Sequence, residues 1–388
     1  MPAGKLTILL SGMLAAVPFQ GGATWAVLQY LLGLRRLGHE VYFVEQMDAR
    51  SLAPSGATLE ASDNAAYFRR VASDFNLRET SALLLRGSRE TTGLGYDDLL
   101  RAAARADVLL NLAGTLDDEG LMNRIPARVY LDLDPAFTQL WHAVEGIDMR
   151  LAGHTHFVTV GLDIGRPSCP VPTCGVEWLT TLQPVVLEEW PAAGSFTRDA
   201  LTTVANWRGY GSVEHEGVFY GQKAHAWREF FQLPTLTREQ FAPALSIHPG
   251  DAKDLNALLE NNWRLLDPAS VAPTPGDYRR FVAESKAEFG VAKSGYVHSR
   301  CGWFSDRSAC YLASGRPVVA QETGFSKHLP TGEGLFSFRN IGDALRCIEE
   351  LNSDYERHAR AARRLAEQFF DSDKVLPRLL SLSGVTSA

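Results

Sequence analysis

Residues 302–320 read GWFSDRSACYLASGRPVVA, the pattern of a capped helix followed by a strand. Ser305 is a typical N-cap residue, and Asp306 follows in the first turn, where the helix dipole favours a negative charge. Gly315 is the type of residue that ends a helix, and Pro317 stands where a helix cannot continue. A helix that leads directly into a β-branched strand is typical of an α/β domain.

The start of this predicted helix opens toward the preceding loop, residues 295–301. Backbone N–H groups at a helix N-terminus have no partner within the helix, so they bind phosphate readily. Lys293 and Arg300 add positive charge nearby. The sequence leaves two interpretations open: a phosphate-binding helix start, or one more capped helix on the surface of an α/β domain.

Length and composition limit the class of protein. A chain of 388 residues is too long for one ordinary hydrophobic core, so two domains are expected. The net charge of -7 argues against a nucleic-acid partner, because affinity for nucleic acid comes mainly from clustered Lys and Arg. The five cysteines do not suit a disulfide framework. Cys169 and Cys174 resemble half of a zinc site, but no second pair has ligand spacing, so we expect no metal.

The apolar run Leu6–Val17, which follows Lys5, resembles the hydrophobic region of a signal peptide. Ser11 and Gly12 interrupt the run, and it leads directly into an amphipathic helix. We interpret it as a buried strand with its loop and expect a cytoplasmic protein. No stretch of the sequence has the length of a transmembrane helix.

The first half alternates strands and a helix in the order typical of a doubly wound parallel sheet. Gly21 and Gly22 precede a helix predicted from about Ala23 to Leu37. The two glycines do not form a G-x-G-x-x-G fingerprint, and we regard them as a candidate phosphate or acceptor loop. The strands predicted in this half are residues 6–10, 41–44, 107–111, 128–132 and 157–160.

Prolines recur between Gly165 and Gly194, which suits an extended connection between domains. We therefore predict one domain of residues 1–190 and a second of residues 191–388. Strands in the second domain are predicted at residues 201–206, 244–247, 263–266, 288–292, 318–320 and 335–338. Helices are predicted at residues 222–231, 253–262, 276–285, 305–314 and 341–351, with a charged helical tail over residues 353–382.

Two Rossmann-like domains in this order resemble the GT-B glycosyltransferases over nearly the whole chain, and the second domain resembles the donor domain of families 1 and 4. The specific motif is narrower: a strand ending near Ser, Glu-Gly-Phe-Gly, Glu-Ala, Gly-x-Pro-Val-Val, and a later Gly-Gly loop. The corresponding stretches here are VAKS (291–294), GWFS (302–305), CYLASGRPVV (310–319) and QETGF (321–325). The resemblance implies that the last helix crosses back onto the first domain.

The resemblance also implies a donor site in the second domain and an acceptor site in the first. The donor residues it suggests are Lys293, Arg300, Trp303, Ser305, Asp306, Arg307, Ser308, Glu322, Thr323 and Gly324. Gly302 and Cys310 stand where many retaining members carry glutamates, and neither residue replaces a carboxylate. Arg307 and Lys293 are the expected partners of a diphosphate. The alternative for Arg307 is an ion pair with Asp306 on a solvated surface.

Transfer of a sugar to a hydroxyl group also needs a base. Asp134 follows a predicted strand, where a doubly wound fold presents its site, and alternation puts Asp132 on the same side. His154 and His156 stand near the start of another strand, and histidine is suited to proton transfer near neutral pH. Each has a structural alternative, because Asp before Pro often forms turns and histidines at strand starts often lie on the surface.

We therefore predict a metal-independent glycosyltransferase without a bound cofactor. Its co-substrate is a nucleoside-diphosphate sugar such as a UDP-sugar, and its acceptor is a small molecule, a glycan or a peptide. We prefer inversion, because the paired glutamates of many retaining members are missing. The alternatives are a sugar-nucleotide epimerase or phosphorylase on the same fold, and a nucleotide-binding relic or scaffold protein without transferase activity. The sequence says nothing of the oligomeric state.

Overall fold

The computed structural model describes residues 4–385. The first half of the chain forms an eight-stranded sheet in the order β4-β3-β2-β1-β5-β6-β7-β8, parallel except for β4. The strands are β1 (Thr7–Ser11), β2 (Glu40–Met47), β3 (Ser81–Leu85), β4 (Thr91–Gly93), β5 (Val108–Leu112), β6 (Ala127–Asp132), β7 (His156–Thr159) and β8 (Trp178–Thr180). The helices of this half are α1 (Gly21–Arg36), α2 (Asp63–Asp74), α3 (Tyr96–Arg105), α4 (Glu119–Met122) and α5 (Phe137–Ala143).

The second half is built on a smaller parallel sheet in the order β16-β15-β14-β9. Its strands are β9 (Arg198–Thr202), β14 (Ser285–Gly290), β15 (Val318–Gln321) and β16 (Leu335–Phe338), accompanied by the parallel pair β10 (Val204–Asn206) and β13 (Ala244–Ser246) and the hairpin β11 (Val213–His215) and β12 (Val218–Tyr220). The helices are α6 (Lys223–Trp227), α7 (Ala252–Glu260), α8 (Pro268–Val271), α9 (Pro275–Glu284), α10 (Ser294–Ser299), α11 (Asp306–Ala313), α12 (Ile341–Ser353), α13 (Tyr355–Leu365) and α14 (Ser372–Leu382).

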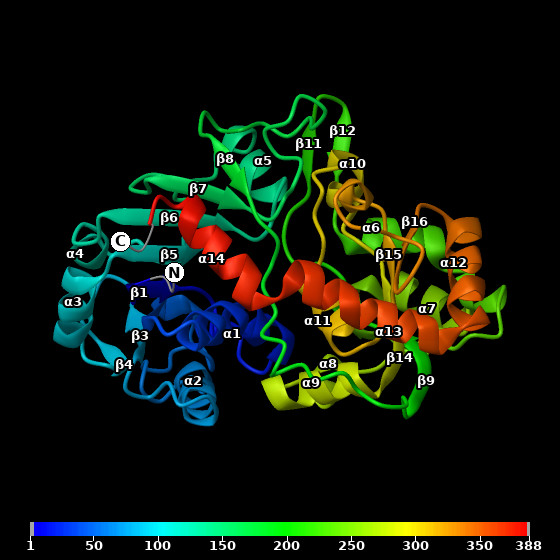
Figure 1. The fold of residues 1–388 in the computed structure, drawn as a ribbon, viewed down its shortest axis with the longest axis horizontal. Helices are drawn as coiled ribbons and strands as arrows, with labels where there is room; N and C mark the ends of the chain where they lie inside the picture. The colour runs from blue at the N-terminus through cyan, green and yellow to red at the C-terminus, as the bar shows by residue number, and fades with distance from the viewer. Residues whose placement is uncertain (1–3, 386–388) are drawn as a thin grey trace.

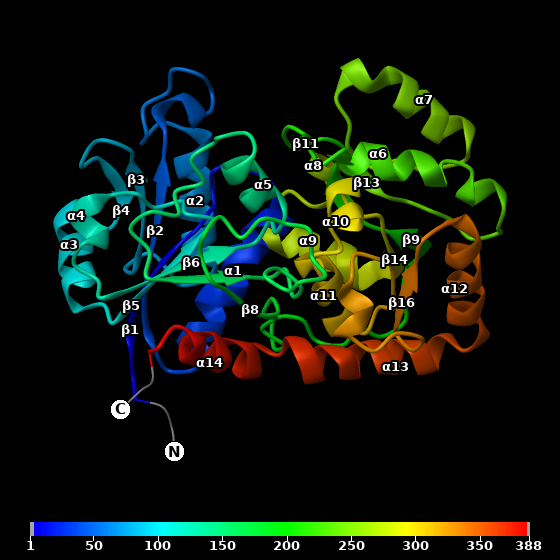
Figure 2. The same cartoon turned by 90° about the horizontal axis from the view of Figure 1, so that it is seen from above.

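This architecture confirms the predicted fold class of two doubly wound α/β units. The two sheets occupy the left and right halves of Figure 1, and the red helices α13 and α14 run along both of them. The turned view in Figure 2 shows the same course. Helix α14 packs on α1, where Arg36 and Asp373 form an ion pair of 3.0 Å. The helix predicted over residues 305–314 and the strands predicted around residues 318–320 and 335–338 are present as α11, β15 and β16.

Three local expectations need correction. The Pro-rich connection is not free of packed elements, because β8 within it pairs with β7. The strand predicted at residues 201–206 is divided at Thr203, and its two parts pair with different neighbours. The strand predicted at residues 263–266 is reduced to one isolated bridge, from Leu266 to Ala244. Pro243 on the neighbouring segment has no N–H group to continue a ladder.

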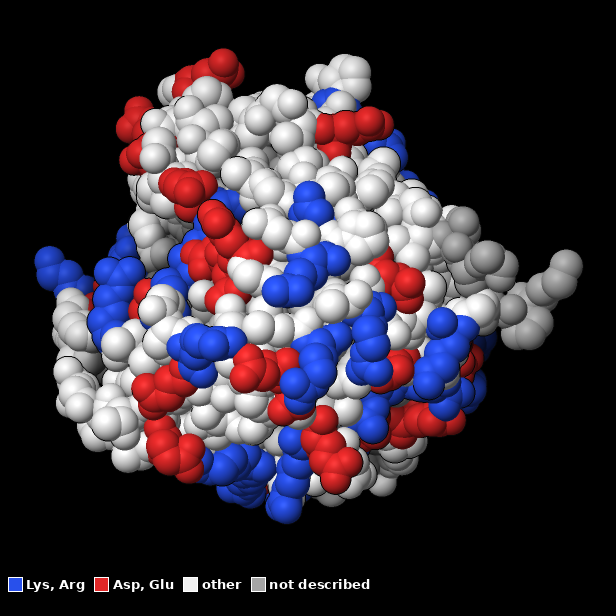
Figure 3. Space-filling model, turned by 90° about the vertical axis from the view of Figure 1, so that its left-hand side faces the viewer, with Lys and Arg blue, Asp and Glu red and all other residues white. Residues whose placement is uncertain are grey.

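Aromatic side chains pack the two halves together. Trp25 of α1 lies edge-on to Trp190, with ring centroids 5.0 Å apart, and Trp190 lies 6.0 Å from Tyr278 of α9. The Trp25 indole N–H also donates to the Pro275 carbonyl oxygen at 2.9 Å. Seen from the first domain, the surface carries acidic and basic side chains side by side (Figure 3). Buried aromatic groups thus make the contact between the two halves. The outer surface of the first domain carries charges of both signs.

The loop after β1 is held by Glu45, a buried residue of β2. One carboxylate oxygen of Glu45 accepts the backbone N–H groups of Leu14 and Ala15 at 2.9 and 2.7 Å, while the other has no hydrogen-bond partner in the described structure. Burial raises the pKa of Glu45 to about 7, although the backbone hydrogen bonds act in the opposite direction. The loop that leads to α1 is thus tied to a carboxyl group that ionises only at a cost.

We expect Glu45→Gln to gain stability over the wild type as pH rises. The folded-state pKa lies above the unfolded value of 4.5, so the contribution of the bound proton is complete below pH 4.5 and is lost as pH rises through about 7. The free energy of unfolding of the variant, relative to that of the wild type, should rise by about 3 kcal/mol over this pH range, which corresponds to the size of the pKa shift. Urea unfolding at a series of pH values measures it, and a constant difference would contradict the assignment.

Candidate functional site

A cavity of about 670 Å³ lies between the two domains. The first domain contributes the end of the loop after β1 and the first residues of α1. The second contributes the carboxyl ends of β10 and β13, the start of α8, and three charged residues of the predicted donor set, Lys293, Asp306 and Arg307. Because ligands of doubly wound folds bind at the carboxyl ends of parallel strands, this cavity is the candidate functional site.

Gly21 and Gly22 form part of the cavity wall on the side of the first domain. The Gly21 N–H donates to the Ala272 carbonyl oxygen at 3.0 Å. A methyl group on Gly21 would lie 2.1 Å from the Thr274 carbonyl oxygen, and one on Gly22 would lie 2.8 Å from the Tyr278 ring. The two glycines therefore let α1 touch the second domain directly, in addition to lining the cavity.

Asp134 and Lys293 form an ion pair across the domain boundary. The Lys293 Nζ atom lies 3.1 and 3.2 Å from the two Asp134 oxygens. The hydroxyl groups of Tyr210 and Tyr296, both from the second domain, also donate to Asp134. Lys293 lies over the Tyr210 ring at 4.0 Å and near the Phe137 ring at 5.0 Å. Asp134 of the first domain is thus surrounded by three donors of the second.

Burial moves both members of this pair toward their neutral forms. It raises the pKa of Asp134 to about 8, against the lowering effect of the Tyr296 hydrogen bond, and it lowers the pKa of Lys293 to about 7. The ion pair opposes both shifts, because each charge stabilises the other. A carboxylate with a raised pKa is a stronger proton acceptor than an ordinary aspartate, which is the property that a general base needs.

The start of α11 is supported by a buried charge cluster. Ser305 is the N-cap residue, as predicted, but its side chain makes no capping hydrogen bond. Arg307 pairs with the fully buried Glu288 of β14 and donates to the Val204 carbonyl oxygen at 3.3 Å. The predicted alternative, an ion pair between Asp306 and Arg307, is absent from the described residues. Arg307 lines the cavity while its guanidinium group is anchored from behind by Glu288.

Lys223 of α6 belongs to the same cluster and was missed by the sequence reasoning. Its ammonium group is buried and donates to the Val291 carbonyl oxygen. Burial lowers the pKa of Lys223 to about 7, Arg307 lowers it further, and Glu288 raises it. Among the described residues only Arg307 forms an ion pair with the buried Glu288 carboxylate, and the charges of both residues act on Lys223. A lysine at the first position of a helix, Gln222-Lys223, was the available signal, but nothing in the sequence placed it next to Arg307.

Three of the other predicted donor residues line a different cavity. Arg300, Glu322 and Gly324 belong to a cavity of about 870 Å³ on the second domain, which Lys293 and Arg307 do not line. Trp303 stacks on Tyr296 with centroids 4.1 Å apart. Three further donor candidates, Trp303, Ser305 and Ser308, line a space of only about 10 Å³ at the start of α11. The last candidate, Thr323, donates its hydroxyl to the Trp303 carbonyl oxygen.

The two residues that replace the expected glutamates are both packed. Gly302 has a φ of +77°, and a methyl group there would lie 3.1 Å from the Asp163 backbone nitrogen. Cys310 is buried and accepts a hydrogen bond from the Gln29 side-chain amide at 3.6 Å. Each position therefore lies against the first domain, with no carboxylate in its place.

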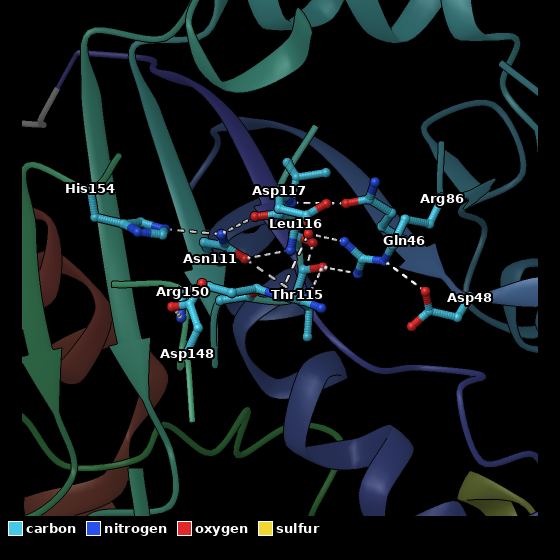
Figure 4. A network of polar contacts seen from close by, with 12 residues as sticks. Gln46, Asp48, Arg86, Asn111, Thr115, Leu116, Asp117, Asp148, Arg150 and His154 are labelled. Carbon is cyan, nitrogen blue, oxygen red and sulfur yellow. Dashed lines mark hydrogen bonds and ion pairs between the residues drawn. The ribbon is translucent and has the colours of Figure 1, made fainter. Parts of the chain in front are cut away.

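The two candidate histidines do not join Asp134. Figure 4 shows His154 pointing toward Asn111 of β5, whose side-chain nitrogen lies 3.0 Å from its Nε2 atom. Asn111 in turn holds Leu116 within a network that includes Arg86 and Asp117. His156 lies next to the Thr155 hydroxyl at 2.9 Å. Burial lowers the pKa of His154, which suits a neutral imidazole in a structural network.

A second contact between the domains was also missed. Asp163, which follows β7, accepts hydrogen bonds from Lys327 at 2.8 Å and His328 at 2.9 Å. Burial alone would raise the pKa of Asp163, but these two partners lower it below its usual range. Within residues 4–385, no group of three or more His, Cys, Asp or Glu side chains is placed to hold a metal ion. Every helix in this part of the chain is too short or too polar to span a bilayer.

Comparison of the chain with known proteins gives a result at the level of structure. No protein-family model matches the sequence, and no curated protein matches it. An alpha-glucosyltransferase solved in complex with UDP and mismatched DNA is 13% identical, with a TM-score of 0.60 over 98% of this chain and 100% of that one. The fold is that of the GT-B glycosyltransferases.

Two further GT-B structures are similar over nearly their whole length. HepE of Anabaena, solved with UDP and glucose, is 12% identical, with a TM-score of 0.58 over 97% of this chain and 99% of that chain. Sucrose-phosphate synthase of Thermosynechococcus elongatus is 9% identical, with a TM-score of 0.53 over 97% of each chain. The likeness confirms the predicted architecture, and at these identities it shows the fold alone.

Proposed function

We propose that the protein transfers a sugar from a nucleoside-diphosphate sugar to a hydroxyl group of an acceptor. The observation that carries this proposal is the cavity between the domains, with Lys293 and Arg307 in its wall and Asp134 paired to Lys293. Positive charge thus lines the cavity, and Asp134, a proton acceptor from the opposite domain, lies beside it through its ion pair with Lys293. The structural neighbours support the donor class, since the alpha-glucosyltransferase and HepE were both solved with UDP.

In this proposal the second domain, residues 191–388, holds the donor and the first domain, residues 1–190, holds the acceptor. Negative charge develops on the leaving diphosphate, and Arg307 and Lys293 stabilise it without a metal. Arg307 is held in place by Glu288, so little reorganisation is needed when the charge appears. No cofactor is required in this scheme.

Asp134 is the proposed base, and it takes the proton from the acceptor hydroxyl. Displacement by a base-activated hydroxyl in one step inverts the anomeric centre, which agrees with the missing glutamates. In the structure Asp134 accepts from Tyr210 and Tyr296, so a bound acceptor must replace at least one of these hydroxyls. The acceptor class, a small molecule, glycan or peptide, and the cytoplasmic location stay predictions.

The alternative of a nucleotide-binding relic has its own support. Gly302 and Cys310 are packed, and the space at the start of α11 is nearly closed. Such a protein would bind the nucleoside-diphosphate sugar, but it would release no free nucleoside diphosphate when an acceptor is added.

We expect UDP or a UDP-sugar to raise the thermal unfolding midpoint, because a ligand that binds only the folded state stabilises it. Ala269→Trp fills the rim of the cavity and should weaken this binding at least tenfold. Ser270→Trp adds the same side chain to α8 outside the cavity and should bind like the wild type. Isothermal titration measures both variants. If no nucleoside diphosphate or its sugars bind the wild type, the proposed function is wrong.

A further inference from the structure

The cavity of about 870 Å³ on the second domain has no role in the transfer scheme. It lies where β14, β15 and β16 end, since α10 follows β14, Glu322 follows β15 and Arg339 follows β16. The β11–β12 hairpin forms its remaining wall. We call this cavity the basic pocket and define it by Phe219, His298, Arg300, Glu322, Lys327 and Arg339.

Two guanidinium groups in the basic pocket have no protein partner. Among the described residues, the side chains of Arg300 and Arg339 make no ion pair within 4.0 Å and no hydrogen bond. Most other arginines of this acidic chain are paired; Arg36, Arg86 and Arg228 each contact a carboxylate. Two uncompensated guanidinium groups facing one concave space are what an anionic ligand requires.

The acidic residue of the pocket does not neutralise these arginines. One Glu322 oxygen accepts the Gly324 N–H at 2.6 Å, and the other accepts the Ser337 hydroxyl at 2.6 Å. Burial would raise the pKa of Glu322, but these hydrogen bonds, with one from Ser326, lower it. The carboxylate oxygens are therefore held by the Gly324 N–H and by Ser337 of β16, and neither arginine contacts them. Lys327 adds a third cation to the pocket, paired with Asp163 at 2.8 Å.

The hairpin gives the pocket an apolar wall. Phe219 is 46% exposed and Val218 is 36% exposed. The Phe219 carbonyl oxygen accepts from the Nδ1 atom of His298 at 2.9 Å, which leaves Nε2 of His298 without a protein partner in the described structure. An anionic group flanked by an exposed aromatic ring suits a ligand that combines a phosphate with an apolar or sugar portion.

We propose that the basic pocket is a second ligand site, which binds an organic phosphate monoester through Arg300 and Arg339 and packs the rest of the ligand on Phe219. This assigns Arg300 to the basic pocket rather than to the nucleotide donor. The proposal is independent of transferase activity, because the basic pocket and the cavity between the domains have no lining residue in common.

The test uses phenyl phosphate as the probe, titrated into the full chain with UDP present at a saturating concentration. The double variant Arg300→Ala/Arg339→Ala is expected to weaken phenyl phosphate binding at least tenfold and to leave UDP binding unchanged. Phe219→Ala is expected to weaken phenyl phosphate binding while inorganic phosphate binds as before. The control Arg238→Ala/Arg360→Ala removes the same charge from exposed positions outside the pocket and should bind like the wild type.

Three results would overturn the proposal. Unchanged phenyl phosphate binding in Arg300→Ala/Arg339→Ala would show that the two arginines do not hold the ligand. Loss of phenyl phosphate binding when UDP is added to the wild type would place it in the nucleotide cavity instead. Equal weakening in the control variant would reduce the effect to general electrostatic attraction. If UDP itself fails to bind while phenyl phosphate binding depends on Arg300 and Arg339, the proposed function fails and the basic pocket stands.

Discussion

Asp134→Asn is expected to lower the rate of sugar transfer by about 10²- to 10⁴-fold, the range that a general base supplies. The amide keeps the shape of the side chain, and its one oxygen still accepts from one of the two tyrosine hydroxyls, but it cannot take a proton from the acceptor. Steady-state rates of UDP release with an acceptor present measure the effect. UDP binding should change much less, because Arg307 and Lys293, the proposed partners of the diphosphate, are both kept.

The pH profile separates a base from a merely structural residue. Burial raises the pKa of Asp134 to about 8, so the wild-type kcat/KM should rise with pH toward that value as the carboxylate form accumulates. In Asp134→Asn this rising limb should disappear. Asp199→Asn alters an aspartate that is 75% exposed and should keep both the rate and the profile of the wild type. Loss of activity with an unchanged profile would contradict the role of Asp134.

Gly21→Ala is expected to destabilise the protein by about 1–3 kcal/mol, as overpacking does. The added methyl group would lie 2.1 Å from the Thr274 carbonyl oxygen, and a backbone atom cannot rotate away as a flexible side chain can. The direction of the change in unfolding free energy is informative, because an ordinary Gly→Ala change in a helix stabilises a protein by up to roughly 1 kcal/mol. Urea unfolding measures the change, and small-angle scattering should show a larger radius of gyration if the domains part.

Gly276→Ala is the matched control. Gly276 also stands in the first turn of a helix, α9, but a methyl group there would come no closer than 3.9 Å to the Thr274 hydroxyl oxygen. This variant should be as stable as the wild type or slightly more stable. Because Gly21 lines the cavity, Gly21→Ala should also weaken nucleotide binding, whereas Gly276→Ala should not. Equal stability of the two variants would contradict the close contact between α1 and the second domain.

The elements that depend on local pattern were predictable. Ser305, Gly315 and the β-branched run at residues 318–320 predicted α11 and β15, because capping and strand preference act over a few residues. The missed elements were short or weakly patterned, such as β8 within a Pro-rich stretch and the β11–β12 hairpin. β8 depends on pairing with β7, and the hairpin strands are only three residues long each, so neither leaves a clear periodic pattern in the sequence.

Some residues of the candidate site were predictable from the sequence, and others were not. Asp134, Lys293 and Arg307 were identified from their places at strand and helix ends, and the structure brings all three to or beside one cavity. The contacts of Tyr210, Tyr296 and Lys223 could not be predicted, because they join groups that are 68 or more residues apart in the chain. His154 was chosen by residue type alone, and its hydrogen bond to Asn111 places it in another network.

The sequence by itself determined the two α/β units and the ends of α11, because these rest on side-chain type, spacing and backbone preference. Only the tertiary structure decided which charges meet. It anchored Arg307 on Glu288, surrounded Asp134 with donors from the opposite domain, and separated Arg300 from Lys293 into two cavities. The physical reason is that an ion pair forms between groups that packing brings within a few ångströms, and their distance along the chain carries no information about that approach.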